Sequence, residues 1–144
     1  MLNWKSKPYE PLETNRIQSR DKIRITALDG MEILIDLTMS NLYLSSNNIG
    51  AEGTKLLAIA LEKNKTLKLV DLSDNLVGDE GTKALAAALE KNTTLHQVYL
   101  NSNHIGAEGA RALASALEKN TSLRKGYFQF FLNPWLFCTL LKSC

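Results

Sequence analysis

The chain has 144 residues, of which 44% are hydrophobic and 22% charged, with a formal net charge of +2. This length suits one globular domain, and the small net charge gives no argument for nucleic-acid binding, which typically needs a basic patch or stripe. The two cysteines, Cys138 and Cys144, exclude a disulfide framework, so we expect a reducing, cytoplasmic location.

The chain begins with a segment that is not expected to pack. Residues 1–21 are polar, include Pro8 and Pro11, and contain no apolar run long enough for a signal peptide, which predicts a loose segment. In residues 22–38, β-branched residues alternate on both sides of Asp29-Gly30. This pattern predicts an N-terminal cap made of a hairpin or short strand, with a degenerate earlier repeat as the alternative.

Residues 39–126 contain one pattern three times. LYLSSNNIGAEG begins at Leu42, VDLSDNLVGDEG at Val70 and VYLNSNHIGAEG at Val98, at a fixed interval of 28 residues. Such a period is typical of a solenoid, in which stacked units complete one another's core.

Each unit divides into two halves with different periodicity. The first half alternates in steps of two, as in Val70 and Leu72, which predicts a strand with one buried face. Met39 stands in the first copy where Leu67 and Leu95 stand in the next two, and we expect the same burial.

The second half of each unit has helical spacing. Gly81, Leu85, Leu89 and Asn92 fall on one face of a helix. We expect Gly81 to allow the helix to approach the strand layer closely, and Asn92 to end the helix in left-handed geometry.

The motif LxLxxNxIGxEG followed by LAxALEKNxTL resembles the leucine-rich repeat family, in its ribonuclease-inhibitor-like class. Ribonuclease inhibitor, Ran GTPase activators, tropomodulins and NOD-like receptor arrays share that class. The motif of this chain is most similar to that of the NOD-like receptor arrays. The resemblance implies a right-handed α/β solenoid with parallel strands on the concave face and helices on the convex face. It also implies that Asn47, Asn75 and Asn103 turn inward as structural residues that bond the backbone of neighbouring turns.

The repeat pattern fades towards the C-terminus. Leu123, Gly126 and Phe128 continue the strand weakly, but Phe131 occupies the asparagine position and no helical half follows. Residues 127–144 are thus an aromatic cap, an exposed surface for a partner or membrane, or the end of a truncated array. The apolar run 127–141 is shorter than the ~20 residues of a spanning helix and is interrupted, so we do not expect a membrane span.

Several motifs resemble chemical sites without meeting their requirements. GAEGTK and GDEGTK lack the glycine spacing of a phosphate loop, and DLSDNLVGDE lacks the glycine and glutamate of a calcium loop. The sequons at Asn64, Asn92 and Asn120 fall at the helix-ending position, so we interpret them as structural. His96 and His104 have no repeated ligand or base beside them and are expected at the surface. We therefore expect no enzyme activity, cofactor or metal.

Binding is expected on the concave sheet, where outward-facing residues align in columns about 4.8 Å apart. The columns are Tyr43, Asp71 and Tyr99, with Tyr127 if a fourth strand forms; Asn41, Leu69, Gln97 and Lys125; and Ser45, Ser73 and Asn101. Tyrosine is enriched at interface hot spots. We expect Tyr43, Asp71, Tyr99, Asn41, Gln97 and Asn101 to contact a partner, whereas the charges of the helices form a solvated face.

These features predict a protein-interaction module, part of a receptor-like or scaffold protein, whose partner is another protein and neither a nucleic acid nor a small-molecule substrate. Two alternatives stay open: a regulator of a small GTPase, like the Ran-directed activators, and a membrane-associated adaptor that uses the aromatic tail.

Overall fold

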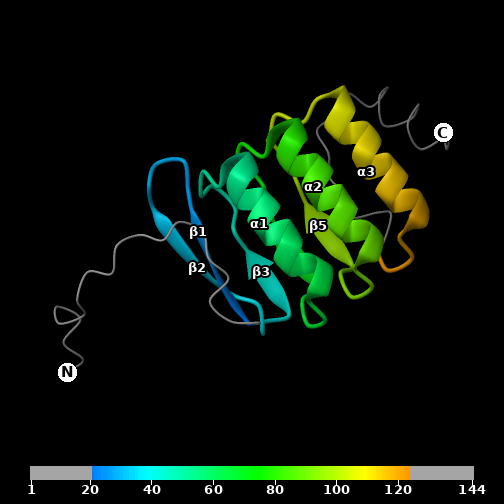
Figure 1. The fold of residues 1–144 in the computed structure, drawn as a ribbon, viewed down its shortest axis with the longest axis horizontal. Helices are drawn as coiled ribbons and strands as arrows, with labels where there is room; N and C mark the ends of the chain where they lie inside the picture. The colour runs from blue at the N-terminus through cyan, green and yellow to red at the C-terminus, as the bar shows by residue number, and fades with distance from the viewer. Residues whose placement is uncertain (1–20, 124–144) are drawn as a thin grey trace.

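The computed structural model describes residues 21–123, which form an antiparallel hairpin followed by three strand–helix units (Figure 1). The hairpin consists of β1 (Lys22–Thr26) and β2 (Glu32–Asp36). The units are β3 (Asn41–Tyr43) with α1 (Gly50–Lys63), β4 (Leu69–Asp71) with α2 (Gly78–Lys91), and β5 (Gln97–Tyr99) with α3 (Ala107–Lys119). The expected order of strand and helix is therefore confirmed for each unit.

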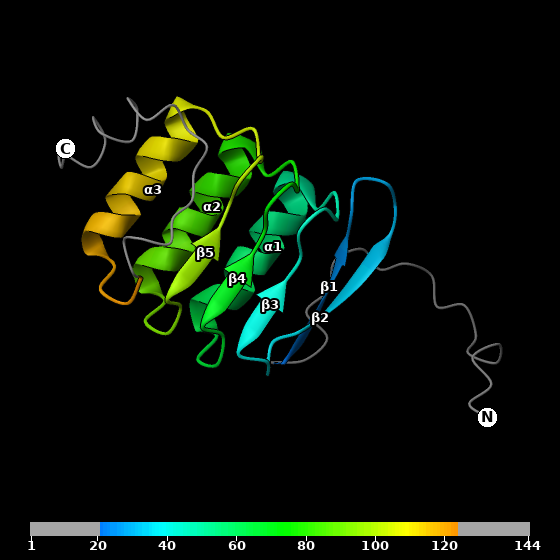
Figure 2. The same ribbon diagram turned by 180° about the vertical axis from the view of Figure 1, so that it is seen from behind.

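The three short strands of the units form one parallel sheet in the order β3-β4-β5. The three helices lie side by side on one face of this sheet, and the other face is turned away from them (Figure 2). Leu42, Val70 and Val98 are register partners, and each points its side chain towards the helices, where it is buried. This is the α/β solenoid architecture that the repeat pattern predicts.

A continuous apolar core runs through the stack between sheet and helices. In the second unit Leu67, Val70, Leu72, Leu85 and Leu89 are all 0% exposed, so both halves of the unit contribute to one interior. Fully burying one such side chain is worth about 1.5–3 kcal/mol. Because each unit also buries its neighbours' side chains, the stability of one unit depends on the next.

The predicted asparagine ladder is present at the turn after each strand. Asn75 Oδ1 accepts hydrogen bonds from the backbone N–H groups of Asn47 (3.0 Å) and Ile49 (3.3 Å) in the preceding unit. Its Nδ2 donates to the carbonyl oxygens of Leu44 and Leu72. One unit later, Asn103 Oδ1 accepts from the N–H groups of Asn75 and Val77, and its Nδ2 donates to Leu72 O. Both side chains are buried, at 0% and 2% exposure. The ladder thus satisfies turn groups that no strand or helix pairs.

A second asparagine ladder ends the helices, and it corrects the expectation for Asn92. The backbone of Asn92 is extended, with φ −75° and ψ 127°, and not left-handed. Its Nδ2 donates to Leu61 O, and its Oδ1 accepts from the N–H groups of Thr94 and Leu95. Asn64 and Asn120 are also extended and make equivalent bonds. The side-chain amide, and not a special φ, therefore ends each helix.

The hairpin lies beside the first unit, where it contacts α1. Ile25 of β1 is 0% exposed, and its Cγ2 would lie 2.7 Å from a Cβ placed on Gly53. In the next unit, a Cβ on Gly81 would lie 2.8 Å from Val77 Cγ1 of the same unit and 3.2 Å from Ala51 and Thr54 of α1. Gly81 therefore also allows neighbouring helices to approach closely, which the pattern within one repeat did not predict. Beside α1, Ile25 of the hairpin thus takes the position that residues of α1 take beside α2.

Met39 does not have the burial that its place in the repeat predicts. It is 54% exposed, whereas Leu67 and Leu95 are 0% exposed. Leu37, at the end of the hairpin, is buried instead, and its carbonyl accepts the hydrogen bonds of Asn64 Nδ2 and Thr66 Oγ1. The chain enters β3 from a hairpin and not from a helix. The buried apolar residue before β3 is therefore Leu37, two positions before Met39.

Candidate partner-binding face

The candidate site is the face of β3-β4-β5 that is turned away from the helices (Figure 2). We call it the sheet face and define it by the nine column residues that lie within residues 21–123: Tyr43, Asp71, Tyr99, Asn41, Leu69, Gln97, Ser45, Ser73 and Asn101. The register pairs Tyr43 with Asp71 and Asp71 with Tyr99, and it pairs Asn41 with Leu69 and Leu69 with Gln97. The structure therefore brings the residues of these two columns side by side.

Backbone hydrogen bonds extend this alignment beyond the strands to the third column. Leu44 N donates to Asp71 O at 2.8 Å, and Leu72 N donates to Tyr99 O at 2.9 Å. Ser46 N donates to Ser73 O, and Asp74 N donates to Asn101 O. Ser45, Ser73 and Asn101 consequently lie on a backbone that is held in register, which makes the whole face a rigid platform.

Exposure differs along the columns. Tyr43 is 65% exposed and Asn41 is exposed, whereas Asp71, Gln97, Tyr99 and Asn101 are half-buried. The Oδ1 atom of Asn101 is buried without a hydrogen-bond partner in the structure. Every predicted contact residue therefore lies on this face, but the surface is most accessible at β3.

Asp71 is the only charged residue among the nine, so the sheet face is otherwise neutral and polar or aromatic. Its Oδ1 accepts the backbone N–H of Ser73 at 2.9 Å. This bond ties the carboxylate to the turn that follows β4. A single oriented carboxylate thus lies in the middle column, with a tyrosine on the strand at each side.

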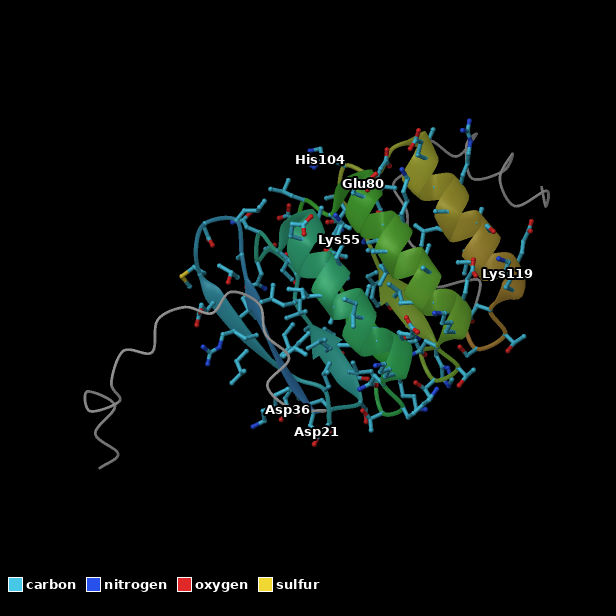
Figure 3. All side chains as sticks on the ribbon, viewed as in Figure 1. Asp21, Asp36, Lys55, Glu80, His104 and Lys119 are labelled. Carbon is cyan, nitrogen blue, oxygen red and sulfur yellow. The ribbon has the colours of Figure 1, made fainter. Side chains whose placement is uncertain are left out.

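The helix face is different, because its charges pair with one another. Lys91 lies 2.9 Å from Glu62, Lys119 lies 3.0 Å from Glu90, and Lys83 lies 2.6 Å from Glu108, so these pairs join neighbouring helices. Figure 3 labels Lys55, Glu80 and Lys119 on this face. Exposed pairs of this kind contribute little to stability.

The lysines near the starts of α1 and α2 are stabilised in their charged form. Hydrogen bonds to Glu108 and Glu80 raise the pKa of Lys83 above its ordinary value. A hydrogen bond to Glu52 raises the pKa of Lys55 in the same direction. These charges are already neutralised by neighbours, which fits the interpretation of the helices as a solvated face.

The motifs that resemble chemical sites have structural environments. The amides of Asn64, Asn92 and Asn120 are all engaged in the helix-ending bonds described above. His104 is exposed in the turn after β5, and His96 is half-buried before that strand. Within residues 21–123, no three His, Cys, Asp or Glu side chains gather as metal ligands would.

The membrane alternative depends on residues 127–144, which lie outside the described part of the chain, as do Lys125 and Tyr127 of the columns. Among the helices of residues 21–123, none has the length and apolar character needed to cross a bilayer.

Sequence reasoning missed one feature of the turns beside the sheet face. The residues that flank each ladder asparagine have positive φ although none is glycine: Ser46, Asn48, Asp74, Leu76, Ser102 and His104. Asparagine and aspartate tolerate this region, but a leucine rarely enters it. The available signal was the residue type, because asparagine, aspartate and histidine, found here at Asn48, Asp74 and His104, enter this region more often than other residues.

Comparisons with known proteins agree with this geometry. The family model described as Leucine Rich repeat matches residues 37–58, 63–86 and 91–114. A search of curated proteins found no match. Among solved structures, leiomodin-1 actin-binding site 2 is similar with a TM-score of 0.59 and 21% sequence identity, over 74% of this chain and 81% of that chain. At this identity the likeness shows the fold alone.

The matched segments coincide with the three strand–helix units, and the parallel sheet orders them along one axis. Residues 37–114 therefore contain three leucine-rich repeats, which stack as a solenoid.

Proposed function

We propose that this chain is a non-enzymatic protein-interaction module that binds another protein through the sheet face. The observation that carries the proposal is the contrast between the two faces. The carboxylates of Glu62, Glu80 and Glu90 on the helix face are each paired with a lysine. The sheet face instead presents aligned tyrosines and amides on a backbone held in register.

The chemistry of this face suits a protein partner. Tyrosine buries a large area at low entropy cost and is enriched among residues that dominate binding energy. Tyr43 is 65% exposed, although burial of an aromatic ring is favourable, so a partner that covers it gains apolar contact area. Asn41 and Gln97 add amide groups that can donate and accept hydrogen bonds.

The test is affinity capture from native lysate with matched variants. We expect Tyr43→Ala with Tyr99→Ala to reduce capture of the partner at least about tenfold, which corresponds to 1.4 kcal/mol, because two anchoring rings are lost. Lys55→Ala with Lys83→Ala changes the helix face by the same number of residues and should leave capture unchanged. The melting temperature of each variant controls for folding.

The opposite result would overturn the proposal. If capture survives the tyrosine changes and is abolished by the lysine changes, the helix face binds the partner. The identity of the captured protein also tests the alternatives, since a small GTPase would favour a regulator. Actin should be included as a defined candidate in a co-sedimentation assay, because the similar solved structure is an actin-binding site of leiomodin-1.

A further inference from the structure

The middle column of the sheet face places one carboxylate between two tyrosines. Asp71 is paired in register with Tyr43 on one side and Tyr99 on the other. Neighbouring strands lie about 4.8 Å apart, so the backbone places both tyrosines directly beside Asp71 on the same face. The faces of aromatic rings carry negative potential and attract cations. A carboxylate between two such rings is therefore a favourable place for a positive group.

The carboxylate of Asp71 has an orientation but no counter-charge within residues 21–123. Its Oδ1 accepts the Ser73 N–H at 2.9 Å, which fixes the direction of the group. No lysine or arginine of the described part of the chain forms an ion pair with it, and none belongs to the nine residues of the sheet face.

Several other carboxylates of the repeats have a lysine or two backbone N–H groups as partners. Glu62 pairs with Lys91, Glu80 with Lys83, and Glu90 with Lys119. Asp79 accepts two backbone N–H groups at the start of α3. Within residues 21–123, Asp71 combines one backbone hydrogen bond with aromatic neighbours and no paired cation, so charge complementarity favours a positive group on the partner.

We infer that the centre of the sheet face is a subsite for the guanidinium group of an arginine on an extended segment of the partner protein. Asp71 accepts its N–H groups, and the rings of Tyr43 and Tyr99 flank its plane. Guanidinium fits this arrangement better than ammonium, because it is planar, stacks on aromatic faces and donates hydrogen bonds within its own plane. This inference rests on the proposed function and names the partner chemistry of the same face.

The experiment is selection from a library of random seven-residue peptides displayed on phage, with the full chain as the target. Peptides selected on the wild type should share an arginine at one position. That preference should vanish on Asp71→Asn, which keeps an oxygen for the Ser73 N–H and removes only the charge. On Asp71→Lys it should change to aspartate or glutamate. Asp74→Asn removes an exposed charge in the neighbouring turn and should keep the arginine preference.

A second measurement uses one selected peptide in synthetic form. Replacing its arginine by the neutral isostere citrulline should weaken binding to the wild type roughly tenfold and should not change binding to Asp71→Asn. An equal effect on both proteins, or a selection without a shared arginine, overturns the inference.

The selected peptides also distinguish a failure of the arginine subsite from a failure of the proposal that the sheet face binds a partner. Peptides that lack arginine but lose binding on Tyr43→Ala with Tyr99→Ala would show that the sheet face binds without a cation subsite. Peptides that are insensitive to both the tyrosine and the Asp71 changes would count against the sheet face itself.

Discussion

The carboxylate of Asp79, on α2, accepts the backbone N–H of Gly109, on α3, at 2.9 Å. The same Oδ1 atom accepts the N–H of Gly106 at 2.7 Å. The start of α3 has no side-chain cap of its own, so the preceding helix supplies one. The contact needs a glycine, because a Cβ on Gly109 would lie 2.6 Å from Asp79 Oδ1. The first turn of one repeat is thus completed by the previous repeat.

Replacing Asp79 should destabilise the last repeat. We expect Asp79→Ala to lower the free energy of unfolding by about 1–2 kcal/mol, because two N–H groups at a helix start lose their acceptor. Asp79→Asn keeps an oxygen and should cost less. Urea unfolding measures the effect, and Asp74→Ala provides a control at an exposed carboxylate. Equal losses for Asp79→Ala and Asp74→Ala would show that the cap contributes nothing.

The two ends of the asparagine ladder should differ in stability. The side chain of Asn75 accepts from the preceding repeat and donates to carbonyl groups. The side chain of Asn47 is half-buried and, within residues 21–123, donates only to the carbonyl oxygens of Leu44 and Ser45 in its own turn. Each buried group left unpaired costs about 1–3 kcal/mol. Asn75→Ala should therefore cost on the order of 3–5 kcal/mol and Asn47→Ala about 1 kcal/mol, measured by chemical denaturation. Similar losses at the two positions would contradict a ladder that couples neighbouring repeats.

The period of 28 residues was sufficient to predict the register of the sheet. Once equal positions stack, Tyr43 must pair with Asp71 and Asp71 with Tyr99, as the structure shows. The inward turn of Asn75 and Asn103 followed from the resemblance in the same way. The columns of the candidate site were therefore predictable, although their use in binding stays a prediction.

Contacts between units were not predictable, because they depend on what lies across the interface and not on the spacing within one repeat. Gly81 lies close to Ala51 and Thr54 of α1, a contact between helices that the pattern within one repeat does not predict. Met39 is exposed because the hairpin delivers Leu37 to the core instead. The side-chain amide of Asn92 donates to Leu61 O in the preceding repeat, and the backbone of Asn92 is extended. The preference of asparagine for helix ends does not reveal this bond, because its acceptor lies in another repeat.

The pKa of Asp36 offers a test at the hairpin end, which Figure 3 labels. Hydrogen bonds from the hydroxyl (2.6 Å) and the N–H (2.9 Å) of Thr38 lower the pKa of this carboxyl below its ordinary value of 3.8. The folded state therefore binds the proton less readily than the unfolded state. The resulting stabilisation is present above about pH 4 and is lost as the pH falls through the folded pKa.

Thr38→Val should raise the pKa of Asp36, because the largest stabilising bond of the charged form is removed. Carboxyl carbon chemical shifts followed by NMR between about pH 2 and 6 measure the change. Thr93→Val makes the same chemical change at an exposed threonine outside the hairpin and should leave the titration of Asp36 as it is. A titration that is identical in wild type and Thr38→Val would mean that the hydroxyl bond does not persist in solution.

Shortening a buried leucine tests whether the helices share one interior with the sheet. Leu85 of α2 is 0% exposed, so Leu85→Ala should cost about 2–5 kcal/mol through lost burial and the cavity left behind. Ile59 of α1 is 50% exposed, and the residue one period later is already alanine, Ala87. Ile59→Ala should be nearly neutral, because alanine also favours the helix. Chemical denaturation compares the two, and only a large difference between them is compatible with a core in which each repeat covers the next.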